Sequence, residues 1–357
     1  MSDILISGYY GFKNSGDDTL LLSIIQQLKN IKSDINLCIL SANPEETRKT
    51  YNVNAIKRDN PFALIKALIS CKMLLVGGGT LIQDATSTKS LLYYLYIIKA
   101  ATMLGKKVML YSNGIGPLKD ENRSITKKIL DKVDVITLRD ELSAKELQTL
   151  GVKKPKIKLL SDCAFGLSIN LSEQAFREKD YFVISVRDFK NLDKSFCDIL
   201  ADVCDYMAKT YSLTPVFVPF QKSKDKKICE DIIEKMSQDA EIFDSECDIE
   251  ELLLLISCAK LCIGMRLHSL IYSVMCNTPV IGLVYDPKVC GFLEYINQKR
   301  YIYTDKLDKS QLLTLLNDCI KNEEIIKSEL KNSYLKMREK AKENSLIAIE
   351  LLNRKEK

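Results

Sequence analysis

The histidine at position 268, the only one in the chain, lies in the segment GMRLHSL, after an apolar run and at the start of a predicted helix. Arg266 precedes it by two residues. A guanidinium, an imidazole that titrates near neutral pH and the amides of a helix N-terminus form an anion site with a proton to donate. A phosphorylated substrate that requires acid catalysis would need this combination. A histidine at such a junction is also often a plain core residue, and the segment alone leaves both interpretations open.

Two further cations follow predicted strands in the same half of the chain. Lys288 lies in the segment VYDPKV, and Arg187 follows the run YFVISV. Because the carboxyl ends of parallel strands share one edge of a sheet, we expect Arg187, Arg266 and Lys288 to lie around His268. Taken alone, Lys288 could equally be a solvated loop lysine.

A glycine-bearing loop, GYYGFKNSGDD, leaves the first predicted strand and enters a helix. Gly11 and Gly16 have the spacing of a phosphate loop, but Asp17 and Asp18 stand where that motif places Lys and Ser or Thr, which disfavours phosphate. Either aspartate could cap the helix, and Asp17 could accept a proton from a sugar hydroxyl. Asn14 is a further candidate contact to a sugar.

A second such loop, VGGGTLIQD, places Gly78 and Gly79 at another strand end, where backbone can approach a ligand closely. The alternative is a tight turn packed under the first loop. Gln83 and Asp84 follow and could hydrogen-bond an acceptor sugar. The segment NGIGP is a third loop of this kind, and we expect all three to converge on one edge.

Arg139 ends another predicted strand of the first half. It would face the cations of the second half across a cleft, or it would pair with Asp140 or Glu141 in salt bridges of little energetic weight.

Alternating short apolar runs and helical periodicities must position these loops. Strands are predicted at 3–7, 36–40, 73–76, 107–112, 133–137, 157–160, 181–186, 214–218, 241–243, 260–263 and 279–284. Helices are predicted at 18–30, 61–69, 88–104, 122–131, 141–149, 192–210, 223–237, 248–257, 267–276, 309–330 and 333–354. We therefore predict an α/β fold of two Rossmann-like doubly wound domains, 1–168 and 169–357, facing a cleft. The polar segment 168–180 would join them, and the last helix would cross back to the first domain.

The composition excludes several classes of protein. Of 357 residues, 46% are hydrophobic and 28% charged, which excludes a disordered or collagen-like chain. A formal net charge of +5, evenly spread, gives no reason to expect nucleic acid as a partner. Twelve cysteines without any CxxC indicate free thiols in a reducing cytoplasm, not a zinc site or a disulfide framework.

Membrane insertion is not expected from the sequence. The start lacks the features of a signal peptide, and no apolar run reaches the roughly 18 residues of a transmembrane helix. The helix that contains LLYYLYII, residues 91–98, is apolar all round and is expected to be buried instead of lying on a membrane surface. The charged C-terminal helix is expected to pack on its own protein.

Taken in order, GYYGFKNSGDD, VGGGTLIQDATS, NGIGP, TLRDELSAKELQTLGV, GMRLHSLIYSV and VYDPKV resemble the polysaccharide pyruvyltransferase family, most closely its bacterial CsaB type. The matching segments span residues 4–289. The resemblance implies a GT-B-like fold and the transfer of pyruvate from phosphoenolpyruvate, a substrate and not a cofactor, to a sugar as a cyclic ketal, with phosphate released. For the CsaB type the acceptor would be an N-acetylmannosamine residue of a lipid-linked cell-wall polysaccharide precursor, and the product would anchor surface-layer proteins. Such an acceptor would bring a cytoplasmic enzyme to the inner face of the cell membrane as a peripheral protein, and no metal or cofactor is required.

The family signature falls on Arg266, Leu267 and His268, and its lysine on Lys288. The resemblance implies that Arg266, Lys288 and Arg187 bind phosphoenolpyruvate and that His268 is the acid. Asp17 is the candidate base, supplied from the opposite domain on closure. A second tier on the acceptor side would comprise Asn14, Gly78, Gly79, Gln83, Asp84 and Arg139.

Two departures from the family pattern and two alternatives accompany this interpretation. Asp18 stands where Glu is common, and SDCAF replaces an Asp-Pro-Ala turn. A GT-B glycosyltransferase that uses a nucleotide sugar would share the architecture, and a non-catalytic binding protein of the same fold is the third hypothesis. A UDP-sugar would stabilise the glycosyltransferase thermally, and phosphoenolpyruvate would not.

Overall fold

The computed structural model describes residues 2–168, 179–189, 192–193, 195–243 and 248–354. The chain divides into two compact units: unit 1 comprises residues 1–168 and 337–357, and unit 2 comprises residues 169–336. Helix α13 (Glu323–Asn353) begins in unit 2 and ends in unit 1. The joining segment expected at 168–180 lies almost entirely outside the described residues.

Unit 1 is built on a parallel sheet with the strand order β3-β2-β1-β4-β5-β6-β7 among its described residues. The strands are β1 (Ile4–Ser7), β2 (Leu37–Ser41), β3 (Asn54–Lys57), β4 (Met73–Gly77), β5 (Lys107–Asn113), β6 (Val135–Leu138) and β7 (Lys156–Leu159). The central strands are buried throughout because helices cover both faces, which explains their continuous apolar runs.

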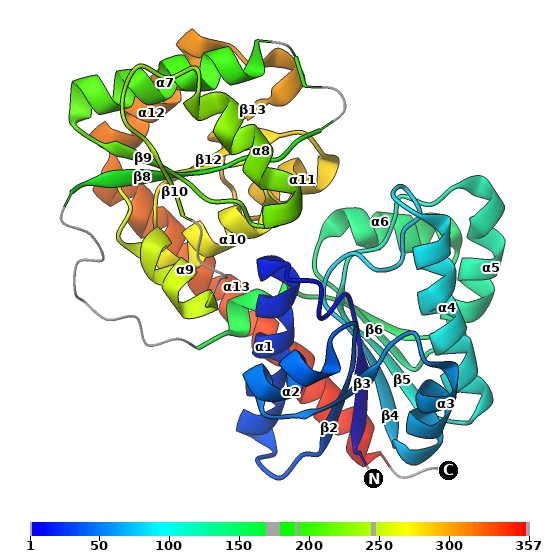
Figure 1. The fold of residues 1–357 in the computed structure, drawn as a ribbon. Coiled ribbons are helices and arrows are strands. Elements are labelled where there is room, and N and C mark those ends of the chain that lie inside the picture. The colour runs from blue at the N-terminus through cyan, green and yellow to red at the C-terminus, as the bar shows by residue number, and fades with distance from the viewer. Residues whose placement is uncertain (1, 169–178, 190–191, 194, 244–247, 355–357) are drawn as a thin grey trace. The chain divides into compact units, whose positions relative to one another are not determined.

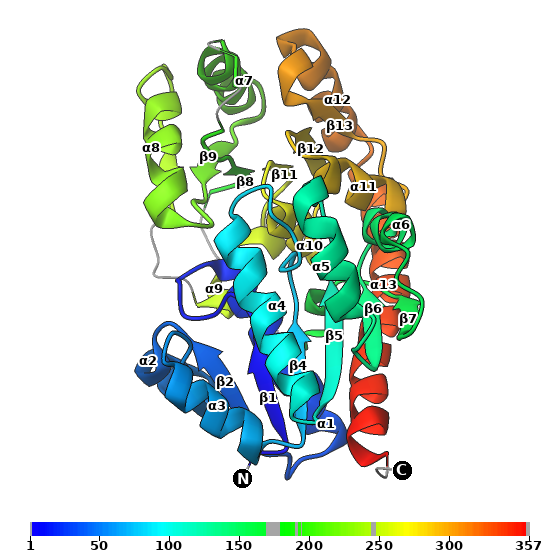
Figure 2. The ribbon, with the colours of Figure 1, turned by 90° about the vertical axis from the view of Figure 1, so that its right-hand side faces the viewer.

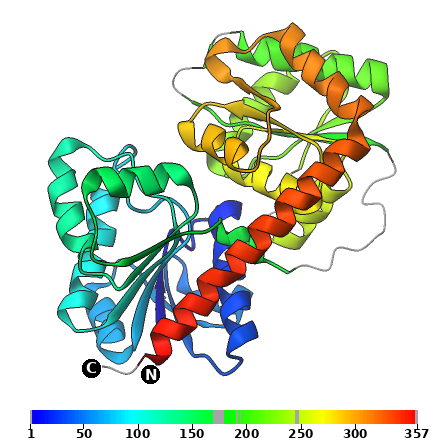
Figure 3. The same cartoon turned by 180° about the vertical axis from the view of Figure 1, so that it is seen from behind.

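Helices α3 to α6 cover one face of this sheet, and α1 covers the other (Figures 1 and 2). The helices of unit 1, with one short 3-10 segment, are α1 (Ser15–Ile31), α2 (Pro44–Tyr51), α3 (Pro61–Ser70), α4 (Thr88–Met103), α5 (Asp120–Leu130), α6 (Glu141–Leu150) and η1 (Cys163–Gly166). The C-terminal part of α13 lies beside α1 (Figure 3). There, the Tyr111 hydroxyl lies 2.5 Å from Ser345 Oγ, and Ser161 Oγ donates to the Met337 carbonyl at 2.7 Å.

Unit 2 repeats the design with a parallel sheet, whose described strands have the order β10-β9-β8-β11-β12-β13. The strands are β8 (Tyr181–Ser185), β9 (Thr214–Phe217), β10 (Glu241–Ile242), β11 (Cys262–Gly264), β12 (Val280–Val284) and β13 (Tyr301–Tyr303). The helices are α7 (Phe196–Tyr211), α8 (Lys222–Ile233), α9 (Ile249–Ser257), α10 (Leu267–Cys276), α11 (Pro287–Tyr295), η2 (Thr304–Lys306) and α12 (Lys309–Lys321). The predicted fold class, two doubly wound α/β units, is confirmed.

The sequence prediction missed two strand and helix pairs. Helix α2 is short and polar, with only Thr47 buried, so it carries no apolar periodicity, and β3 is a half-exposed edge strand. Helix α11 and edge strand β13 were also missed. Lys288 therefore lies in the first turn of a helix, where Pro287 and the Asp286 cap start α11, and the loop position considered for it is wrong.

Two helix boundaries also differ from the prediction. Helix α1 begins at Ser15, because Asn14 has extended backbone and its side chain accepts from the Gly16 amide at 3.1 Å. The expectation that Asp17 or Asp18 is the cap is therefore wrong, and both lie in the first turn. The last two helices separate at Asn322, not near residue 331.

Helix α4 is not buried all round, in contrast to the expectation for LLYYLYII. Its inner side, with Leu91, Tyr94 and Leu95, belongs to the core, but Leu92 is 43% exposed and Tyr96 is 53% exposed.

Within the described parts of the chain, none of the helices is both long and apolar enough to cross a membrane. Each described cysteine is a free thiol. No cluster of three or more His, Cys, Asp or Glu side chains suited to a metal ion occurs among the described residues.

Candidate active site

The carboxyl edge of the unit 2 sheet carries the predicted cations and the histidine. Ser185 of β8 is in register with Gly264 of β11, which is in register with Gly282 of β12. Arg187 and Arg266 each lie two residues beyond these paired positions, so they leave adjacent strands at the same level. Because neighbouring strands are about 4.8 Å apart, the structure brings the two arginine segments together at the edge where α/β sheets bind ligands.

Arg266 is held by a buried carboxylate that the sequence analysis did not identify. Asp225, fully buried in the first turn of α8, accepts hydrogen bonds from Arg266 Nε at 3.0 Å and from Arg266 Nη2. The same carboxylate accepts from the Gln221 amide at 2.8 Å. A bidentate pair fixes the plane of the guanidinium, and Arg266 Nη1 donates to no described residue. Asp225 therefore compensates the charge of Arg266 while it orients the group.

Arg187 differs because it forms no ion pair with any described residue. Its Nη1 donates to the Tyr285 hydroxyl at 2.9 Å, and its guanidinium carbon lies 5.0 Å from the centroid of the same ring. The Arg187 Nε is buried and has no hydrogen-bond partner among the described residues. A buried donor of a cation that lacks an acceptor is costly, and a bound anion would satisfy it.

His268 is the second residue of α10, and its half-buried imidazole packs near the ring of Tyr272. Its ring centroid lies 6.0 Å from that of Tyr272, which in turn lies 5.6 Å from that of Phe220. Arg266 is the cap residue of α10 and makes no side-chain cap hydrogen bond, and the Ser269 amide donates to the Arg266 carbonyl at 3.0 Å. The imidazole therefore lies at a helix end that favours an anion.

Lys288 occupies the corresponding place on α11, next to β12. The Asp286 side chain accepts from the Lys288 amide at 2.9 Å and so starts the helix. Because β8, β11 and β12 are neighbours in the sheet, the segments that carry Arg187, Arg266 with His268, and Lys288 share one edge.

In unit 1, the three glycine loops converge as predicted. The Tyr10 hydroxyl donates to the Gly77 carbonyl at 2.6 Å, which ties the first loop to the second. The Gly114 amide donates to the Gly79 carbonyl at 2.8 Å, which ties the third loop to the second. A methyl group at Gly79 would lie 3.4 Å from Asp17 Oδ1, so the candidate base lies directly beside the second loop.

Gly78 has a packing reason for being glycine. Its φ is +66°, and a Cβ there would lie 2.9 Å from Leu20 Cβ on α1. Its amide donates to the Tyr111 carbonyl at 2.9 Å. The tight turn packed under the first loop is therefore present, and this amide is already satisfied.

Two second-tier residues have local partners. Asp84 is buried and accepts from the Lys119 amide at 2.9 Å and from Asn122 Nδ2 at 2.6 Å, so it fixes the start of α5. Gln83 bonds Thr86 through both ends of its amide.

Arg139 is buried in a polar network at the ends of β6 and β7. Its Nη1 donates to Asp162 at 2.9 Å, its Nη2 donates to Thr80 Oγ1 at 2.8 Å, and Asp140 lies 3.4 Å from its Nε. Burial disfavours the charged guanidinium, but Asp162 and Asp140 outweigh burial and raise the pKa of Arg139. The pairing with Asp140 considered for this residue is present, but it is buried and Asp162 is a second ion-pair partner.

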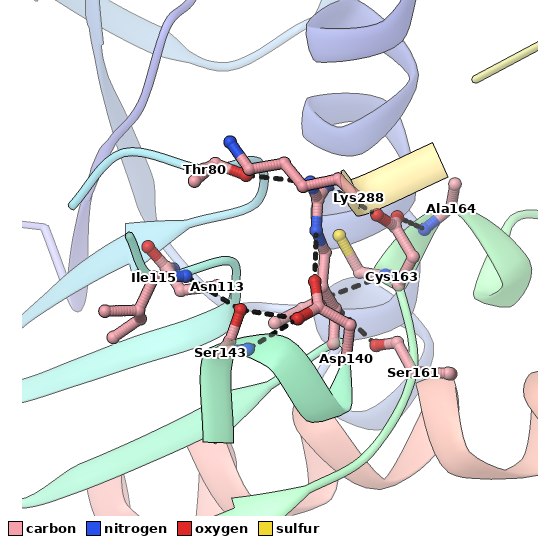
Figure 4. A network of polar contacts seen from close by, with 12 residues as sticks. Thr80, Asn113, Ile115, Asp140, Ser143, Ser161, Cys163, Ala164 and Lys288 are labelled. Atoms are coloured by element: carbon pink, nitrogen blue, oxygen red, sulfur yellow. Dashed lines mark hydrogen bonds and ion pairs between the residues drawn. The ribbon is translucent and has the colours of Figure 1, made fainter. Parts of the chain in front are cut away.

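The same network fixes the third glycine loop. Asp140 accepts from the Ser143 hydroxyl at 2.6 Å, and Ser143 Oγ accepts from the Ile115 amide at 2.8 Å (Figure 4). The segment NGIGP is thereby attached to the start of α6.

Asp18 has the most unusual environment among the acids of the first loop. Its pKa is raised to about 6, mainly by burial and also by the nearby Glu46, while hydrogen bonds with Tyr51 and with the backbone of Asn14 act in the opposite direction. Burial and Asp18 also raise the pKa of the Tyr51 hydroxyl. A carboxyl group that titrates near neutral pH lies next to Asp17 in the chain.

Two site residues escaped the sequence analysis. Asp225 lies in the lysine-rich stretch KSKDKK, which resembles an ordinary solvated helix face, and only its burial against Arg266 gives it a role. Tyr285 lies within the quoted segment VYDPKV, but its contact with Arg187 joins strands about 100 residues apart in sequence.

Comparison with known proteins identifies the family. The family model "Polysaccharide pyruvyl transferase" matches residues 14–287. The amylovoran biosynthesis protein AmsJ of Erwinia amylovora is 20% identical over 356 residues, covering 82% of this chain and 86% of AmsJ.

The similar solved structures show the fold alone. The UDP-GlcNAc 2-epimerase of Methanocaldococcus jannaschii has a TM-score of 0.67 at 14% identity, covering 98% of this chain and 100% of the epimerase. A glycosyltransferase of Rickettsia africae has a TM-score of 0.62 at 13% identity, covering 99% of this chain and 100% of that protein. The chain therefore has the GT-B-like two-domain α/β fold.

Proposed function

Since the chain belongs to the polysaccharide pyruvyl transferase family, we propose that it transfers pyruvate from phosphoenolpyruvate to a sugar of a polysaccharide precursor as a cyclic ketal. One observation supports phosphoenolpyruvate as the pyruvyl donor. Arg187 has a buried donor without an acceptor among the described residues, and it lies level with an anchored Arg266 on the adjacent strand. A pyruvyl donor that carries both a carboxylate and a phosphate offers an anionic group to each of these two guanidiniums.

The donor would be held as follows. Arg187 and Nη1 of Arg266 bind the carboxylate and phosphate oxygens, Lys288 adds a third cation, and the first amides of α10 contribute their dipole. Asp225 keeps the Arg266 guanidinium in plane. His268, at the same helix end, is the acid.

The reaction balances with these groups. The methylene carbon of phosphoenolpyruvate gains a proton and becomes a methyl group, and the central carbon takes on oxocarbenium character. One sugar hydroxyl adds to that carbon, the bond to phosphate breaks, and a neighbouring hydroxyl closes the ketal. Of the two hydroxyl protons, one replaces the proton given to carbon and the other leaves with phosphate. Asp17 would accept the proton of the attacking hydroxyl.

The acceptor assignment rests on the CsaB-type resemblance. We propose N-acetylmannosamine in a lipid-linked cell-wall precursor, pyruvylated at the inner face of the cell membrane, with surface-layer anchoring as the use of the product. Phe12 in the first loop of unit 1 is 39% exposed and supports a sugar acceptor, because a sugar can pack on an exposed aromatic side chain.

The proposal is tested by phosphate release from phosphoenolpyruvate, with and without a synthetic lipid diphosphate disaccharide that contains N-acetylmannosamine. Release should require the acceptor and should fall by at least about 100-fold in His268→Ala, the usual range for loss of a general acid. Lys288→Ala should raise the KM for phosphoenolpyruvate. The matched control is Lys299→Ala, an exposed lysine just before β13 and so at the opposite edge of the same sheet, which should leave KM unchanged.

Equal activity of His268→Ala and wild type would contradict the acid assignment. No release, together with thermal stabilisation by a UDP-sugar and none by phosphoenolpyruvate, would favour glycosyl transfer instead.

A further inference from the structure

The outer face of α3 and α4 has a composition unlike the rest of the surface. Between Pro61 and Lys119 the sequence contains one acidic residue, Asp84, and this side chain is buried. The two helices are neighbours on the same side of the unit 1 sheet (Figures 1 and 2). Lys106, just past α4, donates to the Ile69 carbonyl at 2.9 Å, and this bond ties the end of α4 to the end of α3. Their outward surface therefore carries no negative side chain.

Large apolar side chains are exposed on this surface at helical spacing. On α3, Phe62 and Ile69 lie seven residues apart, and on α4, Leu92, Tyr96 and Met103 follow at intervals of four and seven. We call these residues, together with Leu104, Lys66, Lys89 and Lys99, the α3/α4 face. The exposed fractions are 87% for Phe62, 57% for Ile69, 43% for Leu92, 53% for Tyr96, 73% for Met103 and 41% for Leu104.

Three exposed lysines are interspersed with these side chains. Lys66 lies between Phe62 and Ile69 on α3, and Lys89 and Lys99 flank Leu92 and Tyr96 on α4. Among the described residues, their ammonium groups have no ion-pair or hydrogen-bond partner. This contrasts with many exposed lysines of α8 and α13, which pair with carboxylates one turn away.

We propose that the α3/α4 face docks on the surface of a lipid bilayer that contains anionic lipids. Side chains such as Phe62 and Met103 would enter the boundary between headgroups and acyl chains, with the tyrosine ring at headgroup level. The lysines would bind the anionic headgroups, and their aliphatic stems can lie along the apolar surface. The charge pattern disfavours a second copy of this chain, since a two-fold contact through this face would set lysines against lysines without a carboxylate. The inference does not rest on the pyruvyl transfer proposed above.

The test is co-sedimentation of the full chain with phosphatidylcholine vesicles, with and without phosphatidylglycerol. We expect binding to the anionic vesicles, weakened by added salt because the attraction is screened. Since each lysine contributes roughly fivefold to binding at an anionic surface, the triple variant K66E/K89E/K99E should lose at least about 100-fold. Phe62→Ser should also weaken binding.

Two controls match these variants. K128E/K224E/K331E makes the same change of net charge at exposed lysines on α5, α8 and α13 and should retain most of the binding. Ile325→Ser removes a 62% exposed side chain from α13 and should bind as wild type does. Equal binding to both kinds of vesicle, or equal losses in the two triple variants, would overturn the proposal. Dimers in light scattering that Phe62→Ser abolishes, without vesicle binding, would assign the face to a second copy.

The vesicle-binding result can be told apart from the test of the proposed function. K66E/K89E/K99E should release phosphate from phosphoenolpyruvate as wild type does when the acceptor is water-soluble, and should lose activity only toward an acceptor embedded in vesicles. If no acceptor supports release, the proposed function fails, while the vesicle binding still decides the role of the α3/α4 face.

Discussion

The carboxyl group of Asp18 should make the stability of this protein fall as the pH rises through about 6. Burial is the main cause of its raised pKa, and Tyr51 provides a hydrogen bond that opposes the shift. Since the folded state binds this proton more tightly than the unfolded chain, the associated stability is fully present below the unfolded pKa of 3.8 and is lost as pH rises through about 6. The substitution Asp18→Asn removes the charge and keeps an acceptor for Tyr51.

The magnitude follows from the two pKa values. A rise from 3.8 to about 6 corresponds to about 3 kcal/mol of unfolding free energy at pH 8 as an upper limit. Roughly half of this cost is already present at pH 5, so Asp18→Asn should gain about 1 to 1.5 kcal/mol relative to wild type between pH 5 and pH 8.

Urea denaturation of both proteins at pH 5 and pH 8 measures this difference. Asp34→Asn, an exposed aspartate of the same unit, serves as the control and should show no such dependence on pH. If Asp18→Asn changes the unfolding free energy by the same amount at both pH values, the raised pKa and its origin in burial are refuted.

Two further substitutions test the site and its scaffold. Asp225→Ala should destabilise unit 2 by about 3 to 5 kcal/mol, because it removes the buried partner of Arg266. Asp225→Asn should raise the KM for phosphoenolpyruvate and should lower the unfolding temperature less than Asp225→Ala does. An unchanged KM in a folded Asp225→Asn would contradict the positioning role. Gly78→Ala should cost about 1 to 3 kcal/mol more than Gly105→Ala in denaturation experiments, since both have φ near +66° but only Gly78 would push its Cβ against Leu20. Equal costs would mean that Leu20 moves aside freely.

The sequence predicted the features that depend on neighbours along the chain. Alternating apolar runs predicted both sheets, because each buried parallel strand is apolar regardless of its partners. The convergence of three glycine loops followed from the rule that carboxyl ends of parallel strands share an edge. Edge strand β3 has no such apolar run and was missed.

Features set by partners distant in sequence were not predictable in the same way. Asp225 pairs with Arg266 across 41 positions, and nothing in its neighbourhood distinguishes it from a solvated acid. The cap of α1 depended on the backbone of Asn14, which the adjacent aspartates obscured. For α4, an all-apolar pattern indicated burial, but the core covers one side only and leaves Tyr96 exposed.

Transfer of a pyruvyl group onto a sugar changes the mass of the acceptor, which can be measured directly. The synthetic disaccharide acceptor would be incubated with the protein and phosphoenolpyruvate, and its mass would then be measured by mass spectrometry. The His268→Ala variant would be assayed in the same way for comparison. We predict that wild type adds the mass of pyruvic acid less one water to the acceptor and that His268→Ala adds almost nothing. An unchanged acceptor with phosphoenolpyruvate, together with the gain of one sugar residue from a UDP-sugar, would contradict it.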